Sequence, residues 1–254
     1  MRAGTTWSEY LTSFHSDRAG ITEDVLAAAT AGGVTPYEWL CEPLREVSSL
    51  VLDIACGSGP MRRPLGDVDW VGIDMSANEL GRAALGGTGP LVQADAARLP
   101  IATAAVGAAV CSMALMLVEP FDAVLSEVAR VLAPGGVFVA TIPVERPLRM
   151  SDRLRYLRLF AALRVARLDY PNRAELTDPR ERLARHGLVV VSDERRRFSY
   201  AIADSAAAET LVRSLYLPGV ADDRVDTGVR VARRWRCDIG LPLRRIICRR
   251  ATPA

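Results

Sequence analysis

The central part of the chain alternates between short apolar runs and segments with helical spacing. The apolar runs predict buried strands near residues 50–54, 69–74, 90–94, 107–112 and 136–142. The segments between them predict helices near residues 60–65, 77–84 and 121–132. Right-handed crossovers would place all five strands in one parallel sheet, with their carboxyl ends on a common edge. The pattern therefore predicts an α/β fold.

The segments on either side of this core predict further helices and strands. Residues 5–46 have helical spacing broken at Gly32-Gly33, and residues 151–168 form an amphipathic pattern rich in arginine. Further helices are expected at 178–186 and 205–217, a sixth strand at 188–191 that extends toward 198–202, and a seventh strand at 243–249. We expect a helical lid or extension at 1–46 before a domain at 47–254. That domain would carry a cap insertion at about 143–172 and a second helical insertion at about 203–238.

The most informative stretch is Val51-Leu-Asp-Ile-Ala-Cys-Gly-Ser-Gly-Pro60, in which a buried strand breaks into a turn of small residues. A dinucleotide fingerprint would need a third glycine where Arg62 stands, and a Walker loop would need a lysine, which this chain lacks. Asp53 lies two residues before the small-residue turn. An acid there favours a ligand with a cationic amino group over one with phosphates.

The order Asp53-x-Ala55-x-Gly57-x-Gly59 resembles the first motif of class I S-adenosylmethionine-dependent methyltransferases, with alanine in place of the first glycine. Three further stretches resemble later motifs of that family in the family's order: 71–76, which holds Asp74, 93–100, which holds Asp95, and 131–140. Asp74 follows Asp53 by 21 residues, the distance that a βαβ step requires. The resemblance covers about residues 48–142.

The resemblance implies a Rossmann-like, seven-stranded, mostly parallel sheet flanked by helices. It also implies S-adenosyl-L-methionine as cofactor and S-adenosyl-L-homocysteine as product. In such a site Gly57 and Gly59 would hold the methionine end, Asp74 the ribose hydroxyls, and Asp95 the adenine amine. The expected cofactor-binding residues are Asp53, Ala55, Cys56, Gly57, Gly59, Asp74, Met75, Asp95, Ala96 and Ser112.

The sequence indicates less clearly which residues would bind the molecule that accepts the methyl group. The N/D-P-P-Y/F/W motif of many amine-methylating enzymes is missing after the fourth strand. His15 is the candidate general base, with Tyr10, Glu145 and Tyr156 as alternatives, and catalysis without a base remains open. His186, before Gly187, is better explained as a helix cap. Candidate substrate contacts are Tyr10, Arg18, Met113, Met116 and Tyr156.

Composition narrows the function classes. The five cysteines are scattered with no C-x-x-C spacing, which argues against a zinc site or a disulfide framework, so no metal is expected. Residues 1–10 hold no apolar signal core, and 101–118, although uncharged, fit the fourth strand better than a membrane span. We expect a cytoplasmic protein with a small-molecule substrate and neither a membrane nor a nucleic acid as partner. The oligomeric state is left open.

Two other functions remain open. Residues 146–197 hold 14 arginines against 7 acidic residues, a pattern that an RNA methyltransferase could use to bind phosphates. Few aromatic residues accompany these arginines, and no separate RNA-binding domain is visible. The other alternative is a protein of this fold that binds S-adenosylmethionine and transfers no methyl group.

Overall fold

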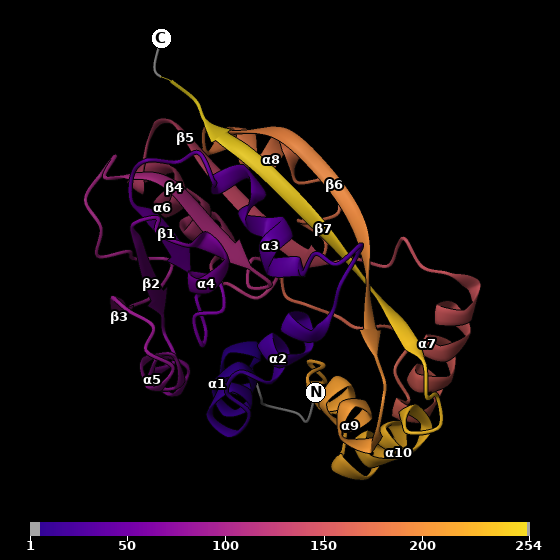
Figure 1. Cartoon of the computed structure of the whole chain (residues 1–254). Coiled ribbons are helices and arrows are strands. Elements are labelled where there is room, and N and C mark those ends of the chain that lie inside the picture. The colour runs from indigo at the N-terminus through magenta and orange to yellow at the C-terminus, as the bar shows by residue number, and fades with distance from the viewer. Residues whose placement is uncertain (1–5, 253–254) are drawn as a thin grey trace. The chain divides into compact units, whose positions relative to one another are not determined.

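A computed structural model describes residues 6–252. Its strands form one seven-stranded sheet in the order β3-β2-β1-β4-β5-β7-β6 (Figure 1). The first five strands pair in parallel, and β6 and β7 point in opposite directions in Figure 1. Their bounds are Val51–Ile54 (β1), Trp70–Asp74 (β2), Leu91–Gln93 (β3), Val106–Ser112 (β4), Leu132–Pro143 (β5), Leu188–Ala201 (β6) and Asp238–Arg250 (β7). This architecture confirms the predicted Rossmann-like α/β fold.

The described chain divides into two compact units. The core unit comprises residues 37–143, 170–195 and 244–252, and the helical unit comprises residues 6–36, 144–169 and 196–243. β6 and β7 each begin in one unit and end in the other. The lid and cap roles expected for residues 1–46 and 143–172 stay predictions.

The core unit is a sheet with helices between its strands. All of β1 and β2 is buried, as expected for strands covered on both faces. α6 buries Val124, Leu125 and Val128 and packs on β5. The helices of this unit are α3 (Pro36–Cys41, which starts at the unit boundary), the 3₁₀ turn η1 (Glu42–Leu44), α4 (Arg62–Leu65), α5 (Ala77–Leu85), α6 (Phe121–Val131) and α8 (Arg180–Arg185).

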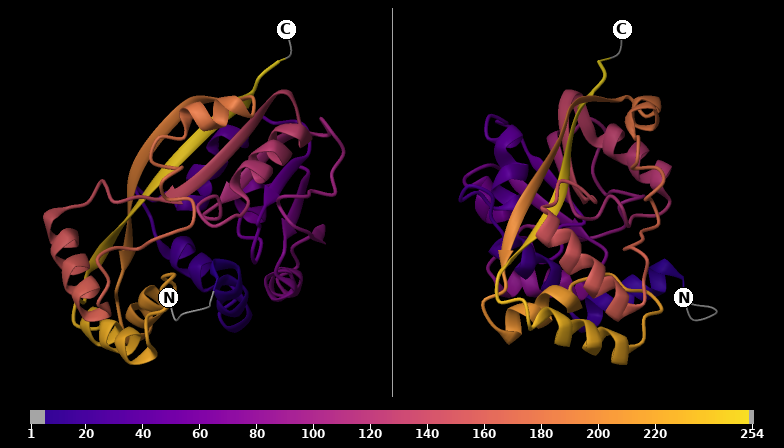
Figure 2. Two further views of the ribbon diagram at one scale, coloured as in Figure 1. Left: turned by 180° about the vertical axis from the view of Figure 1, so that it is seen from behind. Right: turned by 90° about the vertical axis from the view of Figure 1, so that its right-hand side faces the viewer.

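The helical unit contains α1 (Trp7–Asp17), α2 (Ile21–Ala28), α7 (Met150–Leu163), α9 (Ser205–Arg213) and α10 (Asp222–Ala232). α10 packs against both α7 and α9, and the three helices lie together in Figure 2. Gly228 makes the contact with α7 close, because a Cβ there would lie 2.9 Å from Cδ2 of Leu163. No helix of residues 6–252 is long and apolar enough to cross a membrane.

The strands and helices of the core lie within a few residues of their predicted positions. In the helical unit, the helix expected at 205–217 ends at Arg213, and α10 was not predicted as a separate helix. Its buried positions Val225, Gly228, Val229 and Ala232 follow helical spacing, but two of them are small residues. The apolar signal of α10 is therefore weak in the sequence.

Candidate functional site

The ends of neighbouring strands bring the predicted polar residues to one edge of the core sheet. Asp74 is the last residue of β2 and Ser112 the last of β4, while Asp53 precedes the last residue of β1. Asp53 is in register with Val110 of β4, and Asp74 with Gln93 of β3. Because these strands are parallel, their carboxyl ends form the edge at which ligands bind in folds of this kind.

The loop after β1 alternates left-handed and ordinary backbone. Ala55, Gly57 and Gly59 have φ values of 55°, 54° and 76°. Glycine adopts this conformation without strain, whereas Ala55 does so at a cost. Gly59 is also required for space, because a Cβ there would lie 2.6 Å from Cγ2 of Thr88. The loop is tied to β2 by the backbone N–H of Cys56, which donates to the carbonyl of Ile73.

Asp74 organises this loop from the neighbouring strand. The backbone N–H of Gly57 donates to Oδ2 of Asp74, and that of Ser76 donates to Oδ1, both at 2.8 Å. The Asp74 side chain is 9% exposed. A carboxylate can accept about four hydrogen bonds, so these two bonds are compatible with further bonds to a ribose diol. Asp74 therefore joins the loop after β1 to the start of α5.

Asp53 is fully buried, and neither carboxylate oxygen has a hydrogen-bond partner among the described residues. Burial raises the pKa of Asp53 well above its ordinary value; the nearby Trp70 side chain opposes this rise, and the charge of Asp74 adds to it. Burial therefore favours the neutral, protonated form of this carboxyl group in the structure. A direct contact between Asp53 and a ligand is not visible, and that role stays a prediction.

The predicted adenine side of the site is more open. Asp95 lies two residues beyond β3 and is exposed, and its Oδ1 accepts a 2.8 Å hydrogen bond from the backbone N–H of Ala97. Ala96 is half-buried between them. Met75 is 66% exposed although it is apolar, and its carbonyl accepts a 3.1 Å hydrogen bond from Nε2 of Gln93. Sequence reasoning did not assign a role to Gln93, although it ends a strand at the same edge.

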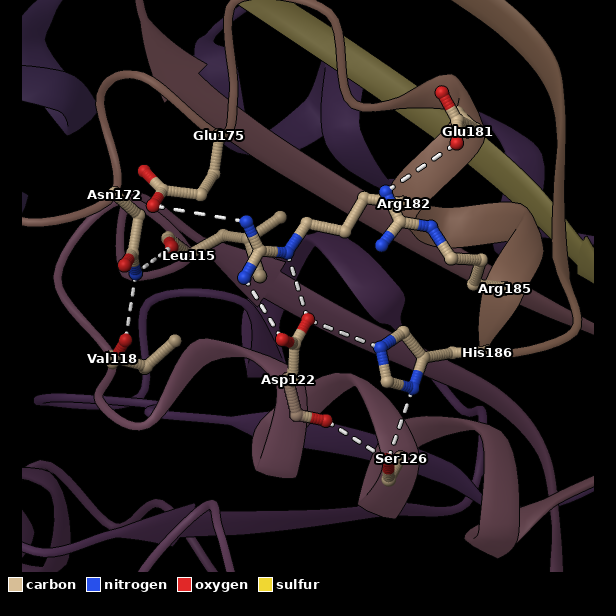
Figure 3. A network of polar contacts seen from close by, with 10 residues as sticks. All are labelled: Leu115, Val118, Asp122, Ser126, Asn172, Glu175, Glu181, Arg182, Arg185 and His186. Carbon is tan, nitrogen blue, oxygen red and sulfur yellow. Dashed lines mark hydrogen bonds and ion pairs between the residues drawn. The ribbon is translucent and has the colours of Figure 1, made fainter.

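The segment after β4 is held from inside the core unit. Met113 has a φ of 56° and donates its backbone N–H to the carbonyl of Thr141. Met113 is half-buried, whereas Met116 is only 2% exposed and packs in the core. Nδ2 of Asn172 donates to the carbonyls of Leu115 and Val118, at 3.1 and 2.6 Å (Figure 3). Asn172 could not be predicted from local sequence patterns, because its partners lie more than 50 residues away.

The candidate acceptor-side residues of the helical unit make contacts within that unit. The hydroxyl of Tyr216 lies 3.4 Å from Nε2 of His15, and the ring of Phe14 packs on both. The hydroxyl of Tyr10 accepts the backbone N–H of Leu217 at 2.7 Å.

Two more of these candidates also contact the backbone. The hydroxyl of Tyr156 donates to the carbonyl of Gly240 at 2.9 Å, and Arg18 donates to the carbonyl of Arg213 at 3.4 Å. These contacts give each side chain a structural role. Their catalytic and substrate roles stay predictions.

A Ser–His–Asp arrangement lies in the core unit at α6 and α8 (Figure 3). Nε2 of His186 lies 3.1 Å from Oδ1 of Asp122, and Nδ1 lies 3.0 Å from Oγ of Ser126. However, Ser126 donates its hydroxyl to the carbonyl of Asp122 within α6, and Arg182 makes two 2.8 Å bonds to the Asp122 carboxylate. Hydrogen bonds from Arg182 and then His186 hold the pKa of Asp122 below its ordinary value. The group joins α8 to α6, and His186 is the residue after the last turn of α8, as its sequence position predicts.

Comparison with known proteins agrees with the geometry of the core unit. Residues 52–140, from β1 to β5, match the family described as methyltransferase domain. These residues are similar to a methyltransferase domain, in agreement with the family that the sequence motifs resemble. The match contains the loop after β1, Asp74, Asp95 and Ser112, so the whole candidate cofactor edge lies in the methyltransferase domain.

A curated relative matches part of the chain. It is the malonyl-[acyl-carrier protein] O-methyltransferase of Alcanivorax borkumensis, 36% identical over 101 residues. The alignment covers 37% of this chain and 34% of the relative, so the chain spans about a third of the relative's length.

Solved structures extend the likeness beyond the methyltransferase domain. A candidate methyltransferase of Bacillus halodurans superposes with a TM-score of 0.58 at 15% identity, covering 85% of this chain and 99% of its own. The [4+2]-cyclase SpnF superposes with a TM-score of 0.54 at 20% identity, covering 85% of this chain and 81% of its own. At these identities the likeness establishes the fold alone.

Proposed function

We propose that the protein binds S-adenosyl-L-methionine at the carboxyl edge of β1, β2 and β3 and transfers its methyl group to a small-molecule acceptor. The observation that carries the proposal is Asp74, which orders the loop after β1 through Gly57 and the start of α5 through Ser76. Asp74 ends β2 inside the residues that match a methyltransferase domain, and the family resemblance implies that an acid at this position binds the ribose of the cofactor.

The remaining roles follow from position and chemistry. The loop at Gly57–Gly59 would lie against the methionine end of the cofactor, and the N–H groups of Gly57 and Gly59 fix its shape by donating to Asp74 and to the carbonyl of Cys56. Asp95 would accept the adenine amine, the Ala96 N–H would donate to a ring nitrogen, and the exposed Met75 would pack on the ring. When bound, the cofactor supplies an activated methyl group on a sulfonium. The chain's task is then to orient donor and acceptor, an effect worth about 7–11 kcal/mol.

Arginines of the 146–197 segment that bind carboxylates of this chain favour a small acceptor over RNA. Arg197 makes two hydrogen bonds to Asp152, and Arg182 makes two to Asp122. These guanidinium groups bind carboxylates of this chain and do not need a phosphate partner. Stacking aromatics, on which single-stranded RNA binding depends, are few in the segment.

Two comparisons suggest other outcomes for the same cofactor site. A structural neighbour is named a cyclase, so a fold of this kind is compatible with a reaction other than methyl transfer. The curated relative is named for a malonyl group on a carrier protein. Its match covers 37% of this chain, and we therefore base no acceptor on it.

The test measures cofactor binding and product formation separately. Calorimetry should show S-adenosyl-L-methionine and S-adenosyl-L-homocysteine binding to the wild-type protein. Incubation with cofactor labelled on its methyl group, and with a panel of small amines, phenols and carboxylates, should yield S-adenosyl-L-homocysteine together with a labelled small molecule. Label found only in added RNA would refute the small acceptor. Absence of cofactor binding would refute the whole proposal.

We also propose His15 as the general base, because its ring is half-buried beside the Tyr216 hydroxyl. His15→Ala should lower turnover while leaving the affinity for S-adenosyl-L-methionine close to that of the wild type. His186→Ala is the matched control, since His186 joins α8 to α6 and should not affect turnover in folded protein. Equal turnover of wild type and His15→Ala would remove this assignment.

A further inference from the structure

Helix α7 of the helical unit has apolar side chains on two opposite faces. Its inner face is buried, with Leu159 and Leu163 packed near Gly228 of α10. On the outer face Met150, Leu154 and Leu157 are 75%, 49% and 67% exposed. Their spacing of four and three residues places them in one row, about 10 Å long at the rise of an α-helix. We call these three residues the outer stripe.

Exposed arginines surround the outer stripe. Residues 146–168 contain seven arginines, and their only acidic residue, Asp152, is fully buried and paired with Arg197. Helical spacing places Arg153 on one side of the stripe and Arg158 on the other. Arg167 is the least available, because it lies 4.0 Å from the exposed Asp169. The exposed arginines are Arg146, Arg149, Arg153, Arg158, Arg164 and Arg167.

We propose that the outer face of α7 docks on an anionic lipid surface. An apolar row bordered by cations is the arrangement with which a helix lies in the plane of a membrane interface. The outer stripe would enter the boundary between headgroups and acyl chains, and the flanking guanidinium groups would bind lipid phosphates. A cluster of four to eight basic residues on an amphipathic helix is characteristic of anionic-lipid binding.

The structure favours lipid over the two other anionic partners. Nucleic acid would leave the outer stripe against phosphates and water, where Met150, Leu154 and Leu157 gain nothing. An acidic protein would need a matching surface of roughly 800 Å² on this side, which one row of three apolar residues does not provide. A fluid lipid surface needs no shape complementarity. This departs from the expectation of no membrane partner, which rested on the missing span; α7 would lie on the surface.

The test uses co-sedimentation of the full-length protein with vesicles. The wild-type protein should bind vesicles of phosphatidylcholine mixed with phosphatidylglycerol at least about 10-fold more tightly than pure phosphatidylcholine, and salt should weaken that binding. Arg153→Gln with Arg158→Gln should weaken binding to the mixed vesicles by about 30-fold. Leu154→Ser with Leu157→Ser should weaken it by about 10-fold or more. All four positions are exposed, so these variants should fold.

Matched control variants distinguish an effect specific to the outer face of α7 from a general effect of net charge or of exposed apolar residues. Arg63→Gln with Arg234→Gln removes the same charge from exposed positions outside α7, and Leu85→Ser removes a leucine that is 92% exposed on α5. Both controls should bind the mixed vesicles as the wild type does. Equal binding to both vesicle types, or equal weakening by the controls, would overturn the proposal. Tighter binding to an RNA oligonucleotide or to polyglutamate than to the mixed vesicles would also overturn it. Cofactor binding, measured in parallel, is independent of this outcome.

Discussion

Ala55 shows at a single residue how the methyltransferase motif is built. The family has a glycine at this position of its first motif, and Ala55 adopts the left-handed conformation that a glycine would adopt without strain, with a φ of 55°. The left-handed conformation costs an L-residue about 1–2 kcal/mol. The motif is therefore retained here in its backbone shape, although one of its glycines is replaced.

The strain at Ala55 predicts that Ala55→Gly stabilises the protein. The free energy gained by relieving the strain should exceed the entropic cost of ordering a glycine on folding. The free energy of unfolding should therefore rise by about 0.5–1 kcal/mol. Chemical denaturation measures this gain. Ala84→Gly, in the last turn of α5 where the backbone has ordinary helical angles, is the control and should destabilise the protein. A loss of stability in both variants would contradict the prediction.

Asp74 is the residue on which the cofactor site depends most directly. Asp74→Asn keeps the size of the side chain but replaces one carboxylate oxygen by an NH₂ group. This NH₂ group would face the backbone N–H of Gly57 or of Ser76, and one of the two hydrogen bonds would be lost. We expect the affinity for S-adenosyl-L-methionine to fall by about 10-fold or more, as measured by calorimetry. Asp67→Asn, at an exposed position after α4, should bind the cofactor normally. Unchanged affinity in folded Asp74→Asn would remove Asp74 from the site.

At the scale of elements, one buried carboxylate anchors α7 to β7 and β6. Oδ1 of Asp152 accepts the backbone N–H of Gly240, and Arg197 of β6 donates to both of its oxygens at 2.7 and 3.0 Å. The side chain of Asp152 is fully buried. Burial raises the pKa of Asp152, but the hydrogen bonds from Arg197 and from the N–H groups of Arg149 and Gly240 outweigh it, so the pKa lies below its ordinary value.

Asp152→Asn should therefore destabilise the helical unit. It leaves Arg197, whose side chain is 13% exposed, without its ionised partner, and breaking a buried pair in this way typically costs about 3–5 kcal/mol. Chemical denaturation monitored by circular dichroism measures the loss. Asp169→Asn removes the same charge from an exposed pair with Arg167 and should cost about 0–1 kcal/mol. Equal stability of the two variants would show that the buried pair contributes no more than the exposed one.

The same carboxylate predicts a pH dependence. A folded-state pKa below the unfolded value means that the stabilisation is complete above the unfolded pKa, which is about 3.9, and is lost as the pH falls through the folded-state pKa. The stability difference between wild type and Asp152→Asn should stay constant from neutral pH to about pH 5 and then narrow in more acidic solution. A difference that widens on acidification would contradict this sign.

Over the whole molecule, the proposed cofactor site lies in the core unit, and a ligand that binds only the folded state stabilises it by mass action. At about 100 times its dissociation constant, S-adenosyl-L-methionine should add about 2.7 kcal/mol, or about 5–10 °C in the thermal midpoint of a domain of this size. NAD should have no effect, because the loop after β1 has Arg62 in place of the third glycine of a dinucleotide site. A shift with NAD and none with S-adenosyl-L-methionine would refute the assignment of the site.

The order of strands and helices in the core, and the residues that end its strands, can be predicted from the amino-acid sequence alone. Buried strands are continuous apolar runs, and the loops between them carry small or polar residues, so both signals are local. Asp53, Asp74 and Ser112 could be placed at one sheet edge because parallel strands share the direction of their carboxyl ends. Helix α10 could not be predicted in the same way, because two of its buried residues, Gly228 and Ala232, are small and add little to its apolar pattern.

Only the tertiary structure decided which side chains meet. Sequence spacing could not distinguish the fully buried, unpartnered Asp53 from Asp74, which bonds two backbone N–H groups of separate loops. Sequence spacing also could not show that Asn172 binds the segment after β4, or that the outer stripe of α7 is exposed. The physical reason is that burial and hydrogen bonding depend on groups brought together from distant parts of the chain, whereas periodicity records only a residue's neighbours in sequence.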